Sequence, residues 1–329
     1  MKRTVISIVC LVFLLAACSL PAPASTPTAM LVPSATQQNT VQPTEFISPT
    51  ATLQPTNTNT PTLTPAPQPV RFAVIGDYGS GDSAEADVAK LILGWHPDFI
   101  ITTGDNNYPD GAADTIDKNV GKYFHTFIFP YTGAYGSGPD GNRFFPSLGN
   151  HDWHAPGAQP YLNYFSLPGN ERYYDFSWGP VHFFALDSDE HEPDGFRANS
   201  AQAAWLKQGL AASTSPWNIV YFHHAAYSSG SIHGSSRWMQ WPFTEWGADA
   251  VLAGHEHLYE CFFVDGIPYF TNGSGGGGLY DFETPLPESK FRYNADYGAM
   301  LVTASGTELT FEFYSRVGHL IDQYKVSKP

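Results

Sequence analysis

From residue 70 onward, the chain alternates short apolar runs with segments of helical periodicity. Residues 83–95 and 201–212 carry apolar side chains at three- and four-residue spacing, which predicts two amphipathic helices, with Ser83 as the N-cap of the first. A third, Trp-rich helical stretch covers 236–246. Compact apolar runs rich in β-branched and aromatic residues predict buried strands at 71–75, 98–103, 143–148, 217–222 and 248–253.

The remaining apolar runs predict a β-rich end. Runs at 173–178 and 181–186 flank Gly179 and Pro180, which is typical of a hairpin. Further strands are expected at 261–265, 267–271, 299–304 and 309–314. Strand–helix alternation followed by strands alone favours a mixed α/β sandwich over a pure Rossmann sheet, and no internal repeat is visible.

The first 18 residues read as a targeting segment. Lys2 and Arg3 give a basic start, and the uncharged stretch 4–17 is shorter than the roughly 20 residues that a membrane-spanning helix needs. It ends in Leu-Ala-Ala-Cys at Cys18, which is similar to a bacterial lipoprotein signal and predicts lipidation of that cysteine. The alternative is an ordinary secretory signal that happens to contain a cysteine. Either signal would export the protein, and a lipoprotein signal would also anchor it at the cell envelope.

Residues 19–69 are dominated by Pro, Thr, Ala and Ser, with Glu45 as their only charge. Such a composition cannot bury enough apolar surface to offset the entropy of ordering, so a disordered linker is expected. Residues 70–329 remain as the folded domain. Cys261 is its only thiol and lies in an apolar run, so it is expected to be a small buried side chain rather than a nucleophile.

The net charge limits the choice of partners. The chain has 16 Lys and Arg against 31 Asp and Glu; without Lys2, Arg3 and Glu45, the domain keeps 14 against 30, a formal charge of −16. An acidic surface repels polyanions, so nucleic acid is excluded as a partner and a small phosphorylated molecule is favoured. The oligomeric state cannot be read from the sequence.

Five short motifs carry the candidate chemistry, and each ends or follows an apolar run. They are Gly-Asp-Tyr-Gly (76–79), Gly-Asp-Asn-Asn-Tyr (104–108), Gly-Asn-His-Asp (149–152), Val-Tyr-Phe-His (220–223) and Gly-His-Glu-His (254–257). Carboxylate, phenolate, amide oxygen and imidazole are the ligands that hydrolytic metal ions prefer, and α/β folds gather sites at strand ends. The motifs therefore predict a two-metal hydrolytic site.

These motifs, in this order, resemble the calcineurin-like metallophosphoesterases, and among them the small, single-domain purple acid phosphatases. The first motif has Asp77-Tyr78-Gly79 where most of that superfamily has Asp-x-His, and the second supplies Tyr108 as purple acid phosphatases do. The resemblance covers nearly all of 70–329. It implies a sandwich of two mixed β-sheets flanked by helices, and hydrolysis of phosphate monoesters by a metal-bound hydroxide that attacks phosphorus.

The resemblance also implies the metal ligands. Asp77, Asp105, Tyr108 and His257 would hold the first ion, expected to be Fe(III), and a phenolate ligand suits such a hard ion. Asp105 would bridge to a second ion, Zn, Mn or Fe(II), which would complete its ligands with Asn150, His223 and His255.

Three further residues are expected to act on the substrate. His151 would donate a proton to the leaving oxygen or bind a phosphate oxygen, Asp152 would orient the His151 ring, and His233 would face the substrate. Ile232 stands where related plant enzymes often have another His. Glu256 is expected to face away from the metals, and His224 to be a packed neighbour of His223.

Other features leave alternatives open. Gly275 to Gly278 resembles a phosphate-binding loop, but no helix or Lys follows, so a flexible loop at the mouth of the site is expected. Trp153 and the segments 161–174 and 238–246 either line a pocket for an aromatic or sugar-like leaving group or pack in the core. The competing functions are a phosphodiesterase acting on nucleotides or lipid headgroups, and a surface module that carries metal without catalysis.

Overall fold

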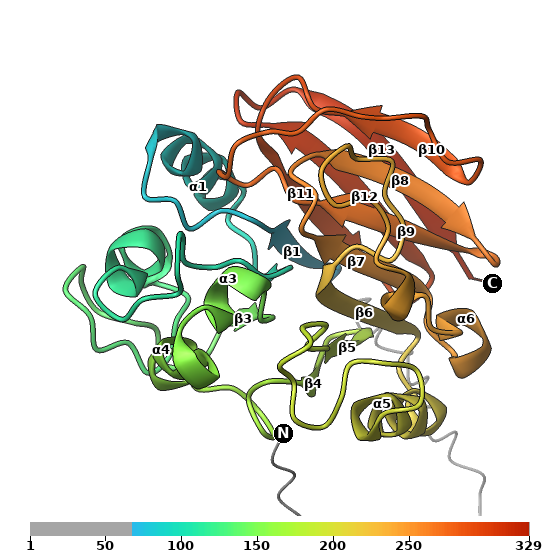
Figure 1. The fold of residues 1–329 in the computed structure, drawn as a ribbon, viewed down its shortest axis with the longest axis horizontal. Helices are drawn as coiled ribbons and strands as arrows, with labels where there is room; N and C mark the ends of the chain where they lie inside the picture. Colours follow the sequence, from blue (N-terminus) through green and yellow to red (C-terminus); the bar gives the residue numbers. More distant parts are fainter. Residues whose placement is uncertain (1–67, 329) are drawn as a thin grey trace, which may run out of the picture. The chain divides into compact units, whose positions relative to one another are not determined.

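The computed structural model describes residues 68–328 (Figure 1). The predicted signal peptide, with Cys18, and nearly all of the predicted linker lie outside the described residues. Within them, no helix combines the length and the apolar character needed to cross a bilayer.

The first sheet has six strands in the order β13-β12-β11-β1-β2-β3. β1, β2 and β3 run parallel, while β11, β12 and β13 pair antiparallel with their neighbours. Its strands are β1 (Val70–Ile75), β2 (Phe99–Thr102), β3 (Phe144–Pro146), β11 (Gly298–Ala304), β12 (Glu308–Ser315) and β13 (Leu320–Ser327).

The second sheet has seven strands in the order β10-β8-β9-β7-β6-β5-β4. β5, β6, β7 and β9 run parallel at its centre, and β4, β8 and β10 are antiparallel additions. Its strands are β4 (Tyr174–Trp178), β5 (Val181–Ala185), β6 (Trp217–His224), β7 (Ala250–Gly254), β8 (Tyr259–Val264), β9 (Ile267–Asn272) and β10 (Ser289–Tyr293). Both sheets are mixed, as expected.

Aromatic side chains join the two sheets into one core. Phe183 of β5 packs edge-to-face on Phe72 of β1 and on Phe99 of β2, with ring centroids 5.0 and 5.3 Å apart. The next residue along β5, Phe184, belongs to a second apolar cluster with Leu206 and Phe243. This alternation shows that the second sheet is buried on both faces, which explains why its central strands read as continuous apolar runs.

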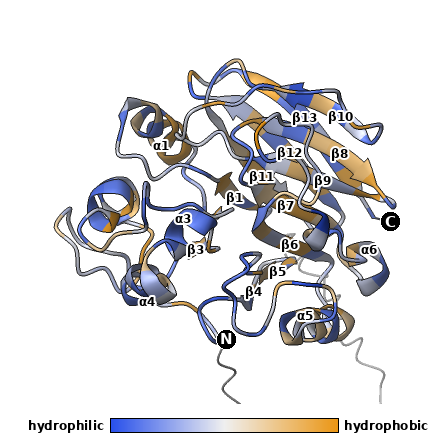
Figure 2. Ribbon diagram, in the orientation of Figure 1, coloured by the Kyte–Doolittle hydropathy of each residue, from blue (hydrophilic) through white to orange (hydrophobic). Residues whose placement is uncertain are grey.

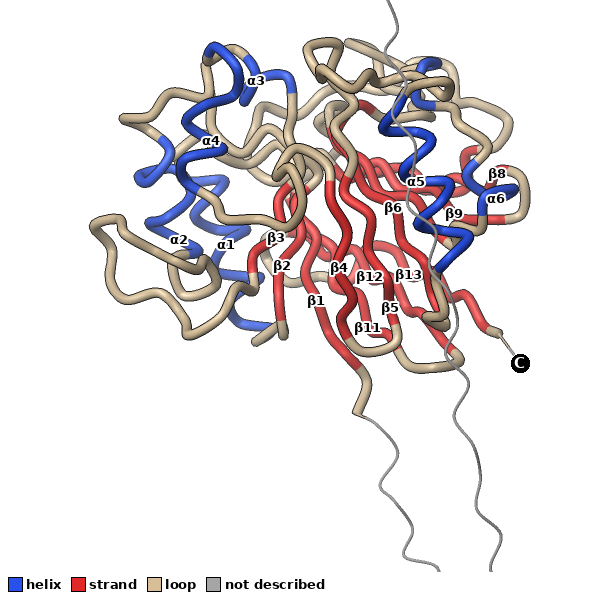
Figure 3. Tube along the Cα trace, turned by 90° about the horizontal axis from the view of Figure 1, so that it is seen from below, coloured by secondary structure: helices blue, strands red, loops and turns tan. Residues whose placement is uncertain are grey.

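Helices flank the two sheets (Figure 3). They are α1 (Ser83–Trp95), α2 (Lys122–Phe124, continuing a π turn), α3 (Asn150–Trp153), α4 (Gln159–Tyr164), α5 (Ala201–Ala212) and α6 (Phe243–Trp246). In the tube view, α1 to α4 lie on one side of the strands and α5 and α6 on the other. The sandwich of two mixed sheets with flanking helices confirms the predicted fold class.

Two local expectations were wrong. The N-cap of α1 is Asp82 rather than Ser83, because the Asp82 carboxylate accepts the amide N–H groups of Ala84 and Glu85 at 2.9 and 3.1 Å. The stretch 236–246 is not one helix: a 3₁₀ turn at Arg237–Met239 and the short α6 are separated at Pro242, whose missing N–H ends the hydrogen-bond ladder.

The parallel strands deliver the predicted motifs to one region. β1 and β2 end next to each other in the first sheet, and β6 and β7 do so in the second. In Figure 2, β1 is largely hydrophobic whereas α3, which carries the third motif, is hydrophilic. The five motifs therefore leave a buried apolar core and converge at the carboxyl ends of these strands.

Candidate metal centre

Three candidate ligands turn sharply as their strands end. Asp77, Asp105 and His255 have φ angles of 54°, 52° and 72°, a left-handed conformation that is uncommon outside glycine. Hydrogen bonds hold two of these turns: the amide of His255 donates to Asp77 Oδ2 at 2.9 Å, and the amide of His151 donates to Asp105 Oδ1 at 2.9 Å. The backbone thus aims both carboxylates into the same space.

One group of candidate ligands comprises Asp77, Tyr108 and His257. The Tyr108 hydroxyl lies 3.3 Å from Asp77 Oδ1 and 3.1 Å from His257 Nε2, and His257 Nε2 lies 3.4 Å from Asp77 Oδ1. His257 Nδ1 lies 2.7 Å from the carbonyl oxygen of Gly278 and must donate to it. In the neutral ring, the Nε2 lone pair therefore points at Tyr108 and Asp77.

The second group comprises Asn150, His223 and His255. His223 Nε2 lies 3.0 Å from Asn150 Oδ1 and 3.1 Å from His255 Nδ1. His223 Nδ1 donates to the carbonyl of Thr103 at 2.8 Å, so its Nε2 also presents a lone pair to these neighbours.

Asp105 lies between the two groups. Its Oδ2 is 3.0 Å from the Tyr108 hydroxyl and 3.4 Å from His223 Nε2. Atoms bound to one ion at 2.0–2.2 Å are about 3–3.5 Å apart, which is the range of separations seen here. Asp77, Asp105 and His223 also meet the geometric requirements of a metal-binding cluster.

The electrostatics of the cluster favour a cation. Burial alone would lower the pKa of His223, but the carboxylates of Asp105 and Asp77 raise it to about 10. Burial together with neighbouring His224, His223 and His233 holds the pKa of His255 well below its usual value. The two buried carboxylates thus favour a positive charge at the centre of the cluster, either a proton on His223 or a metal ion in its place, so the residues present fit a bound metal.

His151 and His233 lie at the border of the cluster. His151 Nδ1 is hydrogen-bonded to the carbonyl of Pro109, and its Nε2 lies 3.9 Å from Asp105 Oδ2. The exposed His233 stacks on His255, with ring centroids 4.1 Å apart. Glu256 turns away from the cluster, as expected, and its carboxylate accepts the amide N–H groups of His233 and Gly234.

The expected role of Asp152 was wrong. Its buried carboxylate accepts the amide of Gly149 at 2.9 Å and both the amide and the side-chain Nδ2 of Asn106. His151 takes its orientation from Pro109 instead. Burial and the neighbouring Asp105 raise the pKa of Asp152 to about 7. Asp152 therefore joins the turn of the second motif (104–108) to α3, and it does not hold the His151 imidazole.

The glycine loop is held by hydrogen bonds rather than left free. The amides of Gly275 and Gly277 donate to the carbonyls of Gly76 and Asp77 at 3.0 and 2.7 Å. A Cβ on Gly277 would meet the His257 ring at 2.6 Å. The glycines are needed because this loop packs directly against a candidate ligand.

Sequence reasoning missed part of the surroundings. Asp189, Phe196 and Arg197, from the loop between β5 and α5, line a cavity next to Asn150 together with Trp238. That loop has no periodicity, so no pattern singled it out. Of the aromatic residues with an open role, Trp238 lines this cavity, whereas Tyr161 and Tyr174 are buried in the core.

Fold and site together define a metal-dependent phosphoesterase: two mixed sheets present carboxylates, a phenol and imidazoles from parallel strand ends. The chain belongs to the calcineurin-like phosphoesterase family, whose model matches residues 70–259.

Among relatives, purple acid phosphatase 4 of Arabidopsis thaliana is 25% identical over 80% of this chain and 86% of that protein. Purple acid phosphatase 17 from the same plant is 24% identical over 79% of this chain and 85% of that protein.

Solved structures share the fold. Purple acid phosphatase PPD1 from yellow lupin (Lupinus luteus) seeds matches with a TM-score of 0.64 at 17% identity, over 79% of this chain and 54% of that chain, so the match spans about half the lupin protein. GAP50, described as the anchor in the inner membrane complex of Plasmodium, matches with a TM-score of 0.61 at 20% identity, over 79% of this chain and 89% of that one.

Proposed function

We propose that the protein is a binuclear-metal hydrolase of phosphate monoesters, of purple acid phosphatase type. The observation that carries the proposal is the position of Asp105 Oδ2, within 3.4 Å of a donor atom in each ligand group. A shared carboxylate between two donor sets is the arrangement that brings two ions close enough to act on one phosphate.

In this proposal Asp77, Tyr108 and His257 hold Fe(III), Asn150, His223 and His255 hold Zn, Mn or Fe(II), and Asp105 is shared. When bound, the two metal ions supply Lewis acidity and lower the pKa of a water molecule that they bind. Tyr108 supports the choice of Fe(III) because a phenolate is a hard oxygen ligand, which a hard trivalent ion prefers.

Side chains of the protein orient the ester and donate the proton that the leaving oxygen needs. His151 holds a proton at Nε2, beside the cluster, and delivers it to the leaving oxygen. His233 contacts a phosphoryl oxygen from the opposite side, and Glu256 positions it through the two amide hydrogen bonds. The His151 side chain is partly exposed, so it can recover its proton from solvent.

Two other functions compete with this one: a phosphodiesterase and a metal-carrying module without catalysis. A phosphodiesterase would use the same ligands, so only its substrate loops would differ. A module without catalysis is the second competitor, and GAP50, a protein with this fold, is described as an anchor. The complete donor set, with both histidines at its border, favours catalysis.

The localisation is also a proposal. The lipoprotein-like signal and the Pro- and Thr-rich linker support a domain tethered at the bacterial cell envelope through Cys18, with a small phosphorylated molecule as its substrate. Membrane contact would come through the lipid alone.

The experiment that tests the ferric site compares Tyr108→Phe with the wild type. Iron-loaded wild type should show a visible tyrosinate-to-iron charge-transfer band, and Tyr108→Phe should lose it while circular dichroism stays native. Tyr280→Phe is the matched control, because Tyr280 stacks on His257 at 4.2 Å without reaching the donor cluster. A colourless iron-loaded wild type that is active with manganese or zinc alone would refute the ferric site and leave the phosphoesterase standing.

A further inference from the structure

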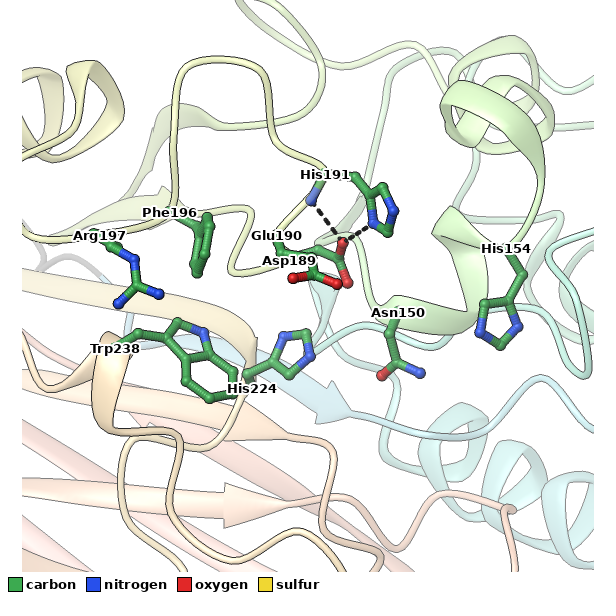
Figure 4. Close-up of a pocket in the computed structure, with 9 residues that line it drawn as sticks. All are labelled: Asn150, His154, Asp189, Glu190, His191, Phe196, Arg197, His224 and Trp238. Atoms are coloured by element: carbon green, nitrogen blue, oxygen red, sulfur yellow. Dashed lines mark hydrogen bonds and ion pairs between the residues drawn. The ribbon is translucent and has the colours of Figure 1, made fainter. Parts of the chain in front are cut away.

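A cavity of about 410 Å³ opens beside the candidate metal centre (Figure 4). Asn150, a candidate ligand, stands at one end, and Arg197 and Trp238 stand at the other, with His224 between them. We call this cavity the aromatic pocket. Its volume lies in the range that accepts small organic ligands, and its position makes it continuous with the place where a phosphoryl group would bind.

Aromatic rings form the end of the pocket distant from Asn150. Trp238 is 36% exposed, and its indole N–H donates to the carbonyl of Ser188 at 3.2 Å, which fixes the ring. Phe196 meets it edge-on, at 6.5 Å between centroids and 82° between planes. A fixed, partly exposed indole beside a second ring offers a stacking surface for a planar group.

One arginine, Arg197, lines this end of the aromatic pocket, and a second, Arg237, lines a hollow next to it. In residues 68–328, Arg197 and Arg237 are the only arginines whose guanidinium groups have neither a hydrogen bond nor an ion pair within the protein. Both line a second hollow of about 370 Å³, which shares Arg197 and Trp238 with the aromatic pocket. Two cations without an ion pair therefore line one hollow of a chain whose net charge is −15.

Two acids of the neighbouring loop have partners of their own. Asp189 pairs with His191 at 2.6 Å, and Glu192 pairs with Arg172 at 2.9 Å. Glu190 remains exposed in the pocket wall. Arg197 lies over the Phe196 ring, with its guanidinium carbon 4.9 Å from the ring centroid, and has no ion pair within residues 68–328, so it can bind an anion from solution at the end of the cavity distant from Asn150.

We propose that the aromatic pocket binds the leaving group of an aromatic phosphate monoester that carries a second anionic group, a carboxylate or a phosphate. The phosphoryl group lies at the metal centre, the ring stacks on Trp238, and the distal anion pairs with Arg197 and Arg237. Hydrolysis consumes one water, breaks the bond between phosphorus and the leaving oxygen, and leaves that oxygen protonated. This inference rests on the proposed function.

The test compares three esters: phenyl phosphate, 4-carboxyphenyl phosphate and 1,4-phenylene bisphosphate. The wild type should prefer at least one of the two esters that carry a second anionic group over phenyl phosphate. The expected preference is about tenfold in kcat/KM, which is about 1.4 kcal/mol. The ester that is preferred identifies the anion as carboxylate or phosphate. The double variant R197Q/R237Q should reduce that preference to near unity. Arg292→Gln, which removes one positive charge on β10 where Arg292 bonds to Ser289, should leave the preference intact.

A binding measurement separates this inference from the proposed function. Calorimetry with phenylphosphonate and 4-carboxyphenylphosphonate, which cannot be hydrolysed, should show tighter binding of the carboxylate in the wild type and no difference in R197Q/R237Q. Selective binding without hydrolysis of any ester would refute the phosphatase and support the pocket. Hydrolysis of all three esters at equal kcat/KM, with equal phosphonate affinities, would refute the pocket and leave the phosphatase standing.

Discussion

Glu85 offers a quantitative test of the structure beneath the metal centre. It lies in the first turn of α1 with its side chain fully buried, and its Oε2 accepts the amide of Gly81 at 2.6 Å. Its Oε1 has no partner among the described residues. A Cβ on Gly276, in the glycine loop, would meet the Glu85 Cβ at 3.0 Å. Glu85 is thus a buried acid packed under the loop that holds a candidate ligand.

Burial raises the pKa of Glu85 from 4.5 to about 9; Asp82 adds to the increase, and the Gly81 amide opposes it. Between these values the folded protein keeps a proton that the unfolded chain has lost. The free energy of unfolding therefore falls as the pH rises, by up to about 1.4 kcal/mol per pH unit. From pH 5 to pH 8 the loss reaches at most about 4 kcal/mol.

Glu85→Gln removes the titration and keeps an oxygen that accepts from Gly81. Any cost of the new amide is independent of pH, so the slope is the informative quantity. Urea unfolding of metal-free protein at pH 5, 6, 7 and 8 should show the variant gaining stability over the wild type with each step. Glu245→Gln, at an exposed position on α6, controls for the lost charge and should show no such trend. A stability difference that is the same at all four pH values would refute the buried, protonated carboxyl.

The remaining predictions concern the site and the anchor. His151→Ala should lower kcat by about 10²–10⁴-fold with near-normal metal content, whereas His255→Ala should deplete metal; equal metal loss in both would contradict the assigned roles. Glu256→Ala should lower kcat/KM by about tenfold because the amides of His233 and Gly234 lose their acceptor, and Glu256→Gln should retain most activity; identical losses would argue for a role of the charge itself. Cys18→Ser should release the protein or leave an unprocessed precursor in membrane fractionation, and unchanged processing would exclude lipidation.

Strands were easiest to predict where both faces of the sheet are buried, because such a strand has a continuous run of apolar residues. β6 and β7 were predicted for that reason, and with them the positions of His223 and His255. β13 was missed because its edge position leaves a polar sequence, with most of its side chains exposed or half-buried. β10 was missed for the same reason.

Contacts between distant segments set the limit of prediction for the site. The candidate ligands could be predicted because each follows a strand, but the sequence holds no measure of the distances across the sheets. Asp152 shows the difference: its neighbour in sequence is His151, yet besides the amide of Gly149 it accepts hydrogen bonds from Asn106, 46 residues away. Arg197 and Arg237 likewise meet only through the fold, so their shared hollow was invisible in the linear pattern.

The left-handed conformations at the metal centre support a bound cation. Each non-glycine residue held there costs on the order of 1 kcal/mol, and Asp77, Asp105 and His255 all adopt it. The carboxylates of Asp77 and Asp105 are buried, and within residues 68–328 no Lys or Arg is among their hydrogen-bond or ion-pair partners. The metal-free protein gains nothing from this arrangement that a glycine turn and apolar side chains would not supply at lower cost. Bound cations offset both costs at once, because they neutralise the carboxylates and use the direction in which the strained turns aim them.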